Sequence, residues 1–298
     1  MTRLFAVALI ALPLHAVRAQ QLDSLRARIE TRIAEVPATA VGVYFRDLGT
    51  GDTLLVNAHA RFHAASTMKV PVMIQLFRER DAGGLSLDDS VLVHNEFRSI
   101  VDGSPYSLDQ ADDSDSSLYD LEGHRVTIRR LVELMETVSS NLATNLLIDR
   151  VGAARANASA HALGADSILV LRGVEDGRAY RAGMNNTTTA RDLGMLLAAL
   201  AEGRAAAAPS CNEMLAILGR QHFNEGIPAG LPPGTRVEHK TGWIGTVVYH
   251  DAAIVRPAQG APYVLVVLTA GIKEDGVAYA LVADLSRLVY ETSRGASL

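Results

Sequence analysis

Ser66 and Lys69 have the types and the spacing that nucleophilic catalysis requires. They lie three residues apart in Ser-Thr-Met-Lys, so a helix places them on one face. A serine hydroxyl is a poor nucleophile that needs a nearby base or cation, and a lysine can serve as either when burial and neighbouring cations lower its pKa. At a helix start the Ser66 N–H also points outward, where it suits an oxyanion. The apolar residues 70–74 that follow indicate a buried helix.

A second motif, Ser139-Ser140-Asn141, falls between two segments with helical periodicity. Serine and asparagine are ordinary helix caps at such a place, which is its structural interpretation. Its functional interpretation is that Ser139 passes a proton to a leaving nitrogen and that Asn141 donates a hydrogen bond to a substrate amide.

The third motif is Lys240-Thr241-Gly242, at the end of a strand-like segment. We expect Lys240 to bring a positive charge into the site and Thr241 to bind a substrate carboxylate. Gly242 is expected to let substrate approach the strand backbone closely. An exposed strand end is its structural interpretation, as an N-cap serine followed by a surface lysine is that of the first motif. All three structural interpretations must hold together for the site to be absent.

Composition sets broad limits on the fold and the partners. The chain has 298 residues, 48% of them hydrophobic, which suffices for a large core in one domain of two lobes or in two closely packed domains. The net charge of −5 and the lack of a basic run argue against a nucleic-acid partner and favour a small ligand. Cys211 is the only cysteine, so the sequence predicts a buried thiol, no intrachain disulfide and no cysteine-based metal site.

The first 19 residues have the pattern of a signal peptide. Arg3 precedes an apolar run over residues 4–14, and Val17-Arg18-Ala19 places small residues before a cut near Gln20. The run is too short to span a bilayer, and no later segment is long and apolar enough. We expect cleavage and export to a bacterial periplasm or the medium, with no membrane contact afterwards.

Strand patterns occur at both ends of the chain and helical patterns occur between them. The predicted strands are 39–47, 53–57, 236–240, 247–255 and 263–268; the predicted helices are 22–36, 66–80, 126–138, 142–151, 190–200, 212–220 and 275–292. This order predicts an α/β fold of the α+β type within one catalytic domain, residues 20–298. An antiparallel sheet lobe comes from both termini, about 20–60 and 206–298, and an all-helical lobe, about 61–205, is inserted into it. The active site is expected between the lobes.

Residues 99–123 form an acidic segment without a helical or strand pattern. Asp112-Asp113-Ser114-Asp115 offers hard oxygen ligands, but the segment lacks the calcium-loop spacing. The preferred interpretation is a solvated surface loop that can overhang the site.

On these residues the chain resembles the class A serine β-lactamases and their penicillin-recognising relatives over nearly its whole mature length. Residues 62–69, 139–145 and 239–243 resemble the three family motifs, and 186–193 resemble the segment after the family's Ω-loop. The resemblance implies that a β-lactam acylates Ser66 and that the acyl-enzyme is hydrolysed, with no metal or other cofactor. It also implies an oxyanion hole of the Ser66 and Trp243 N–H groups, and Asn145 supporting the Ω-loop.

Deacylation needs a carboxylate that holds a water molecule, and in the family a loop glutamate does this with an asparagine four residues later. Glu175 stands at the family's separation from the second motif, with Asp176 as a rival base. The residue four positions after Glu175 in this chain is Ala179, so the helper asparagine of the family is missing. Asn185 and Asn186 are the candidate substitutes for it.

Two further positions depart from the family's pattern. Ser140 replaces the aspartate that usually stands inside the second motif, and Trp243 is bulky where the family often has a small residue. Together with the missing asparagine four residues after Glu175, these departures put the rate of deacylation in question. They do not affect the assignment of Ser66 as the nucleophile.

The leading prediction is therefore an exported, monomeric serine β-lactamase whose partner is a small β-lactam. The alternative is a D,D-peptidase or esterase-like penicillin-binding hydrolase with slow deacylation. A non-catalytic penicillin-sensing module is a third interpretation, disfavoured because such sensors carry a membrane span and a signalling domain.

Overall fold

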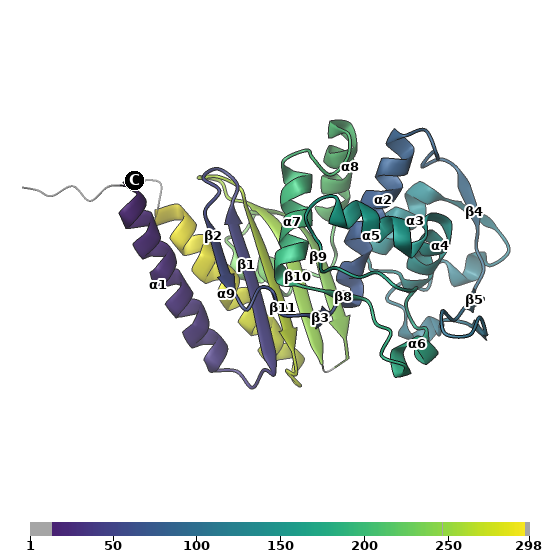
Figure 1. Cartoon of the computed structure of the whole chain (residues 1–298), viewed down its shortest axis with the longest axis horizontal. Coiled ribbons are helices and arrows are strands. Elements are labelled where there is room, and N and C mark those ends of the chain that lie inside the picture. Colours follow the sequence, from purple (N-terminus) through teal and green to yellow (C-terminus); the bar gives the residue numbers. More distant parts are fainter. Residues whose placement is uncertain (1–13, 246, 296–298) are drawn as a thin grey trace, which may run out of the picture.

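A five-stranded antiparallel sheet built from both ends of the chain forms one half of the molecule (Figure 1). The computed structural model describes residues 14–245 and 247–295. The strand order is β2-β1-β11-β10-β9, with β1 Ala40–Asp47, β2 Thr53–Val56, β9 Arg236–Ile244, β10 Val248–Arg256 and β11 Tyr263–Ala270. Because β1 pairs with β11, the N-terminal hairpin and the C-terminal strands make one sheet, as predicted.

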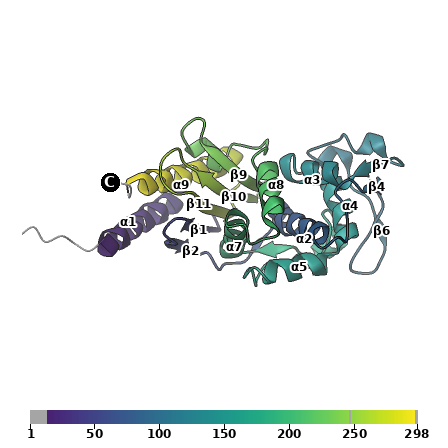
Figure 2. The same ribbon diagram turned by 90° about the horizontal axis from the view of Figure 1, so that it is seen from above.

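Helices cover both faces of this sheet (Figures 1 and 2). α1 (Leu14–Ala34) and α9 (Asp275–Gly295) pack together on the outer face, and α7 (Ala190–Ala201) packs on β1, β10 and β11 from the inner face. A strand covered on both sides is expected to be apolar throughout, and residues 263–269 of β11 are indeed all buried. The sheet is thus a rigid platform for the third motif, which lies on its edge strand β9.

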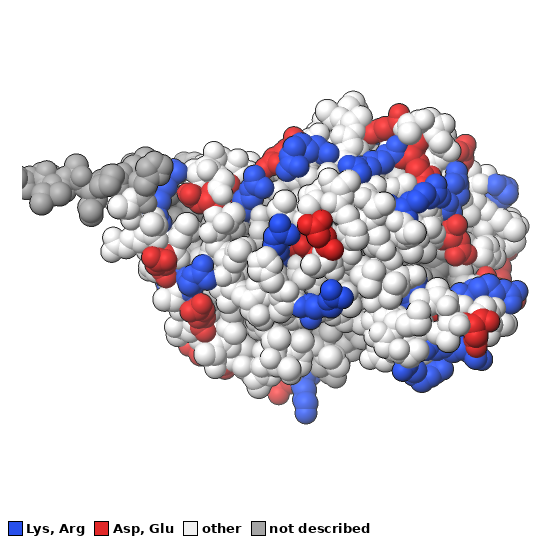
Figure 3. All heavy atoms as spheres, viewed as in Figure 1, with Lys and Arg blue, Asp and Glu red and all other residues white. Residues whose placement is uncertain are grey.

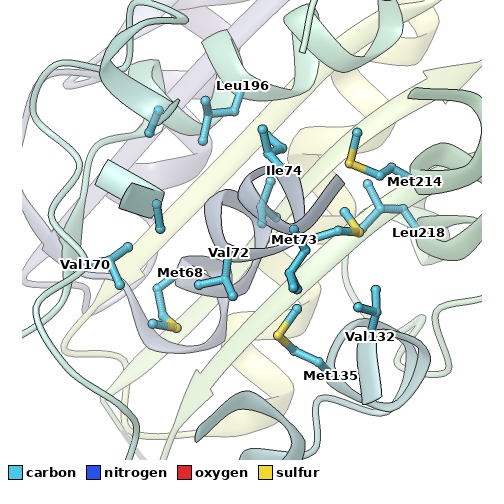
Figure 4. Close-up of a cluster of buried hydrophobic side chains, with 14 of the residues drawn as sticks. Met68, Val72, Met73, Ile74, Val132, Met135, Val170, Leu196, Met214 and Leu218 are labelled. Atoms are coloured by element: carbon cyan, nitrogen blue, oxygen red, sulfur yellow. The ribbon is translucent and has the colours of Figure 1, made fainter. Parts of the chain in front are cut away.

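The second half of the molecule surrounds α2 (Lys69–Asp81), the helix that follows the nucleophile. Its helices are α3 Ile128–Thr137, α4 Asn141–Val151, α5 Ala153–His161, α6 Gly177–Arg181 and α8 Ala208–Leu218. Figure 4 shows Val72, Met73 and Ile74 of α2 among side chains from α3, α7 and α8. Nine consecutive α2 residues, 69–77, are buried, so the helix is the axis of this lobe.

The inserted lobe differs from the prediction in that it is not all-helical. Three pairs of short strands belong to it: β3 Phe62–His63 with β8 Thr187–Thr188, β4 Ser90–Leu92 with β7 Arg125–Thr127, and β5 Phe97–Arg98 with β6 Pro105–Tyr106. Strands of two or three residues carry no readable alternation, which is why the pattern missed them. The same holds for the short helix α6. The lobe boundaries at about 60 and 206 stay predictions.

Most of the predicted signal peptide, residues 1–13, lies outside the described residues, and 14–19 belong to the first turns of α1. In the described part of the chain no helix has the length and apolarity to cross a membrane. On the face drawn in Figure 3, acidic and basic side chains alternate over the surface without a large patch of either sign. Cys211 is a buried free thiol in α8, as expected.

Candidate active site

Ser66 lies in a 3₁₀ turn, Ala65–Met68, directly before α2. The predicted helix start at residue 66 is wrong, because residues 65–68 form this 3₁₀ turn, no side-chain cap bond forms there and α2 begins at Lys69. His63 holds the entry to this turn, since its Nδ1 accepts a hydrogen bond from Ala65 N at 3.0 Å. His250 of β10 donates from Nε2 to the His63 carbonyl at 2.8 Å, which ties the turn to the sheet.

Lys69 is fully buried at the start of α2. Its Nζ donates to Ser139 O at 2.6 Å, to Ser139 Oγ at 3.1 Å and to Asn141 Oδ1 at 3.1 Å. Burial, reinforced by the nearby charge of Lys240, holds the pKa of this amine well below its usual range. An ammonium donates all three of these bonds, whereas the neutral amine donates two and has a lone pair. The neutral form is therefore a proton acceptor, which is the property a serine nucleophile needs.

Lys240 reaches the same serine from the opposite lobe. Its Nζ donates to Ser139 Oγ at 3.0 Å and to Thr241 O at 3.1 Å. Burial lowers the pKa of Lys240 to about 8, while the carboxylates of Glu136 and Asp251 act in the opposite direction. The Ser139 hydroxyl therefore contacts two lysines, and a hydroxyl so placed can relay a proton between donors and acceptors.

Glu175 faces this cluster from the loop of residues 172–180, the counterpart of the family's Ω-loop. Its Oε1 accepts a hydrogen bond from Asn141 Nδ2 at 2.8 Å, and its Oε2 accepts one from Asp109 N at 3.3 Å. Burial raises the pKa of the Glu175 carboxyl against the effect of these bonds. Asn141 thus joins the two sides of the site, because its Oδ1 accepts from Lys69 and its Nδ2 donates to Glu175.

The carboxylate of Asp176, the alternative base, is hydrogen-bonded to groups outside the Lys69–Ser139–Lys240 cluster. Its carboxylate caps α6 by accepting from Ala179 N at 3.0 Å, and it also accepts from Ser99 Oγ and Ile100 N. Although burial opposes it, these hydrogen bonds lower the pKa of Asp176. A carboxylate held by three donors is structural, so Glu175 is the better-placed of the two.

Neither candidate helper asparagine contacts Glu175. Asn185 Oδ1 accepts from Arg172 at 3.1 Å, and the Asn186 side chain bonds to the backbone of Leu171 and Arg172. Ala179 is completely buried. Among the described residues, the amide that bonds to Glu175 therefore comes from the second motif.

Asn145 supports the Ω-loop as expected. Its Oδ1 accepts from Val174 N at 2.7 Å and its Nδ2 donates to Val174 O at 3.1 Å. A Cβ at Gly173 would lie 2.5 Å from the Asn145 amide oxygen, so the close approach of loop and helix requires glycine there. These contacts fix the backbone immediately before Glu175.

Strained backbone is concentrated in the site. Four non-glycine residues of the described chain have positive φ, and three of them are Ala65 at 45°, Ser139 at 60° and Glu175 at 62°. This conformation is costly for residues with a Cβ and persists only where the surrounding contacts impose it. The nucleophile turn, the second motif and the loop of Glu175 therefore each have one strained residue.

The acidic segment is more than a solvated loop, because Asp113 bonds to the second motif. Its Oδ1 accepts from Asn141 N at 2.9 Å and its Oδ2 accepts from Leu142 N at 2.9 Å, which caps α4. Tyr119 OH donates to the same carboxylate at 3.1 Å. Where the family has an aspartate inside the motif, this chain has Ser140, and a carboxylate distant in sequence satisfies the helix N-terminus.

Gly242 and Trp243 lie on β9 beside the nucleophile turn. A Cβ on Gly242 would meet the side chains of Ala65 and Thr67 at 3.2 Å each. The glycine thus lets β9 approach the turn that carries Ser66; it also lines the cleft, and its contact with substrate stays a prediction. Trp243 is 55% exposed at the rim, as anticipated for a bulky residue there.

A cleft of about 750 Å³ opens over these groups, and Ser66, Ser139, Asn141, Glu175 and Thr241 all line it. A second cavity of about 290 Å³ adjoins it and shares Ser66, Asn141 and Glu175 with the first. Asp112 and Asp113 line the larger cleft, so the acidic segment overhangs the site. Within the described residues, no group of three or more His, Cys, Asp and Glu side chains is arranged to hold a metal ion.

Two buried or loop carboxylates near the site were missed as functional residues by the sequence analysis. Asp113 had no local signal, because its partners are 28 and 29 residues away. Glu136 did have one: it falls on the apolar stripe of Ile128 and Val132, at positions i+8 and i+4, where a carboxylate is unexpected.

The fold and this arrangement are those of a serine-based penicillin-recognising enzyme. The model of the β-lactamase enzyme family matches residues 24–293, and the chain belongs to that family.

Among curated relatives, the carbapenem-hydrolyzing β-lactamase KPC of Klebsiella oxytoca is 29% identical over 97% of this chain and 96% of its own length. Among solved structures, a β-lactamase from Sphaerobacter thermophilus is 30% identical with a TM-score of 0.76, covering 92% of this chain and 97% of that one. A mutant of PBP-A, solved as an acyl-enzyme complex with penicillin G, is 29% identical with a TM-score of 0.78, covering 92% and 97%. The antiparallel sheet with packed helices is the fold these structures share.

Proposed function

We propose that the protein hydrolyses β-lactams by way of an acyl-enzyme on Ser66. In this mechanism Ser66 attacks the lactam carbonyl and Lys69, or Glu175 through a water molecule, takes its proton. The N–H groups of Ser66 and Trp243 stabilise the oxyanion. Ser139 then passes a proton to the expelled nitrogen, assisted by Lys240.

Substrate binding is assigned to the second and third motifs. Lys240 and Thr241 hold the substrate carboxylate, and Asn141 donates to the side-chain amide of the substrate. Gly242 keeps β9 close enough to the nucleophile turn for the oxyanion donors to converge. No metal takes part in these steps.

The observation that carries the hydrolytic step is the position of Glu175. Its carboxylate lines the same cleft as Ser66 and is oriented by Asn141 at 2.8 Å. A carboxyl whose pKa is raised by burial is a stronger base once ionised, which suits activation of a deacylating water.

The test compares burst and steady-state hydrolysis of one penicillin by wild type and by Glu175→Gln. We expect Glu175→Gln to retain the burst while the steady-state rate falls at least about a hundredfold. Asp176→Asn is the matched control for a neighbouring loop carboxylate, and a Ser66→Ala variant must lose the burst. Equal steady-state rates in wild type and Glu175→Gln contradict the assignment.

A second function, a penicillin-binding hydrolase with slow deacylation, is favoured by one observation. Ala179 stands at the helper position, and neither Asn185 nor Asn186 contacts Glu175. This alternative predicts a penicillin adduct on Ser66 that persists for minutes and is visible by intact mass. Rapid loss of the adduct excludes it.

We further propose that the mature protein is an exported monomer. The leader-like residues 1–19 support export. On the face drawn in Figure 3 the charges of both signs are interspersed, without a large single-sign patch that would attract an oppositely charged partner. N-terminal sequencing of the secreted protein and its elution volume in size-exclusion chromatography test both statements.

A further inference from the structure

Glu136, near the end of α3, is a buried carboxylate to which the mechanism above gives no role. The residue is completely buried, and neither carboxylate oxygen has a hydrogen-bond partner in the described part of the chain. Its neighbourhood is built for an apolar side chain, because Val132 and Met135 of the same helix point into the core beside α2 (Figure 4). A buried carboxylate without a partner is unfavourable and requires an explanation.

The charged groups that most affect the pKa of Glu136 are the two lysines of the site, Lys240 and Lys69. Glu136 stands three residues before Ser139, and both lysine amines lie within 3.1 Å of the Ser139 hydroxyl. Burial raises the pKa of Glu136 to about 7, opposed first by Lys240 and then by Lys69. Neither carboxylate oxygen of Glu136 bonds to a lysine among the described residues, so its charge acts on them through the low-dielectric interior.

The other carboxylates around the lysines are occupied. Asp113 and Glu175, on the Lys69 side, bond to the backbone and side chain of Asn141. Asp251 of β10, on the Lys240 side, contacts His239 Nδ1 at 2.9 Å and accepts from Ile227 N at 2.8 Å. α8 and the segment after it supply Gln221, whose amide donates to the Glu136 carbonyl rather than to its carboxylate. Glu136 is therefore the carboxylate here without a competing bond.

We propose that Glu136 is a positioning residue, the buried counter-charge that keeps Lys240 protonated while the amine of Lys69 stays free to accept a proton. Two lysines that share one serine hydroxyl repel each other when both are charged. The negative charge of Glu136 interacts more strongly with Lys240 than with Lys69. It therefore favours the state in which Lys240 holds the proton. The proposal rests on the roles given to Lys69 and Lys240 under the proposed function.

The test is the pH dependence of Ser66 acylation, measured between pH 5.5 and 9.5 with a fluorescent penicillin. At pH 5.5, well below its pKa of about 7, Glu136 is largely neutral in the wild type, so Glu136→Gln should acylate there within about twofold of wild type. Above pH 7 the variant lacks the charge that supports Lys240. In its pH profile the fall of the acylation rate at alkaline pH should therefore begin about one pH unit lower than in the wild type. At pH 8.5 the variant should then acylate about tenfold more slowly than the wild type.

Two variants separate this role from a structural one. Glu136→Asp keeps the charge and should restore the alkaline limb, at least in part. Glu133→Gln, one turn earlier on α3, removes a partly exposed glutamate paired with Arg220 and should leave the profile unchanged. A uniform loss of rate in Glu136→Gln at every pH, or an unshifted alkaline limb, overturns the proposal.

A second measurement, on protein that retains Glu136, tests the proposal if Glu136→Gln fails to fold. Carbon-13 NMR of glutamate carboxyl carbons, in the Glu175→Gln background, should show one carboxyl that titrates near pH 7. If instead one glutamate carboxyl stays protonated above pH 9, Glu136 has no charge to give Lys240, and the proposal is wrong. Because acylation is followed directly, an enzyme that acylates but fails to hydrolyse would contradict the proposed function and leave this test intact.

Discussion

Replacing Asp113 by alanine removes the carboxylate that links the acidic segment to the second motif. The substitution deletes the hydrogen bonds from Asn141 N and Leu142 N, both near 2.9 Å, and the one from Tyr119 OH. Ser140 continues to cap Ala143 N, so α4 keeps one of its cap bonds. The backbone of Asn141, whose side chain joins Lys69 and Glu175, loses its anchor.

The size of the effect follows from the number and kind of bonds. A hydrogen bond to a charged acceptor contributes about 1.5–3 kcal/mol, but water replaces part of it at a half-buried site. Loss of a helix N-cap costs about 1 kcal/mol. We therefore expect Asp113→Ala to lower the free energy of unfolding by about 2 kcal/mol, which lowers Tm by about 4–8 °C. Displacement of Asn141 should slow acylation about ten- to a hundredfold.

The assay pairs thermal unfolding with the acylation rate of Ser66. Asp112→Ala is the matched control, because this exposed neighbour lines the same cleft but is not bonded to α4. We expect the control to stay within about 0.5 kcal/mol of wild type. If Asp113→Ala unfolds and acylates like the wild type, or if both variants lose the same amount, the reasoning is refuted.

Three further predictions concern the loop and the edge strand. Glu175 must be ionised to act as a base, and burial raises its pKa above the ordinary 4.5. In a pH profile of kcat, steady-state hydrolysis should therefore fall as the pH drops through a value above 4.5. A fall that begins only at or below pH 4.5 contradicts this. Gly242→Ala should slow acylation about tenfold while Tm changes little, because the new methyl group lies 3.2 Å from Thr67; an unchanged acylation rate argues against this contact. Asn145→Ala should remove about 2 kcal/mol of support from Val174 and reduce hydrolysis more than acylation, measured by the ratio of steady state to burst; equal losses in both phases contradict it.

The parts of the fold that the sequence predicted are those with long periodic patterns. The hairpin at the start and the buried strand β11 have continuous apolar runs, and the predicted strand 39–47 differs from β1 by one residue. The three motifs were likewise readable because their spacing is local. Elements of two to five residues, such as β5 and α6, carry too few positions for a period to show.

Features that depend on long-range contact could not be read from the chain. Asp113 is one of many acids in a polar segment, and only the fold brings it to α4. The 3₁₀ turn at Ser66 arises because His63 and the sheet hold Ala65 at positive φ, against the local preference for a regular helix start. In both cases tertiary structure overrides a reasonable local interpretation.

The amide of Asn141 has a consequence for how the two half-reactions can be altered. Its oxygen faces the Lys69 amine and its nitrogen faces the Glu175 carboxylate, so the dipole has one favourable direction and a flip would oppose both groups. A proton gained or lost at either end therefore changes the energy of the same oriented dipole. Acylation and deacylation are in this way electrically linked, and a substitution that tunes the base for one step also shifts the partner that serves the other.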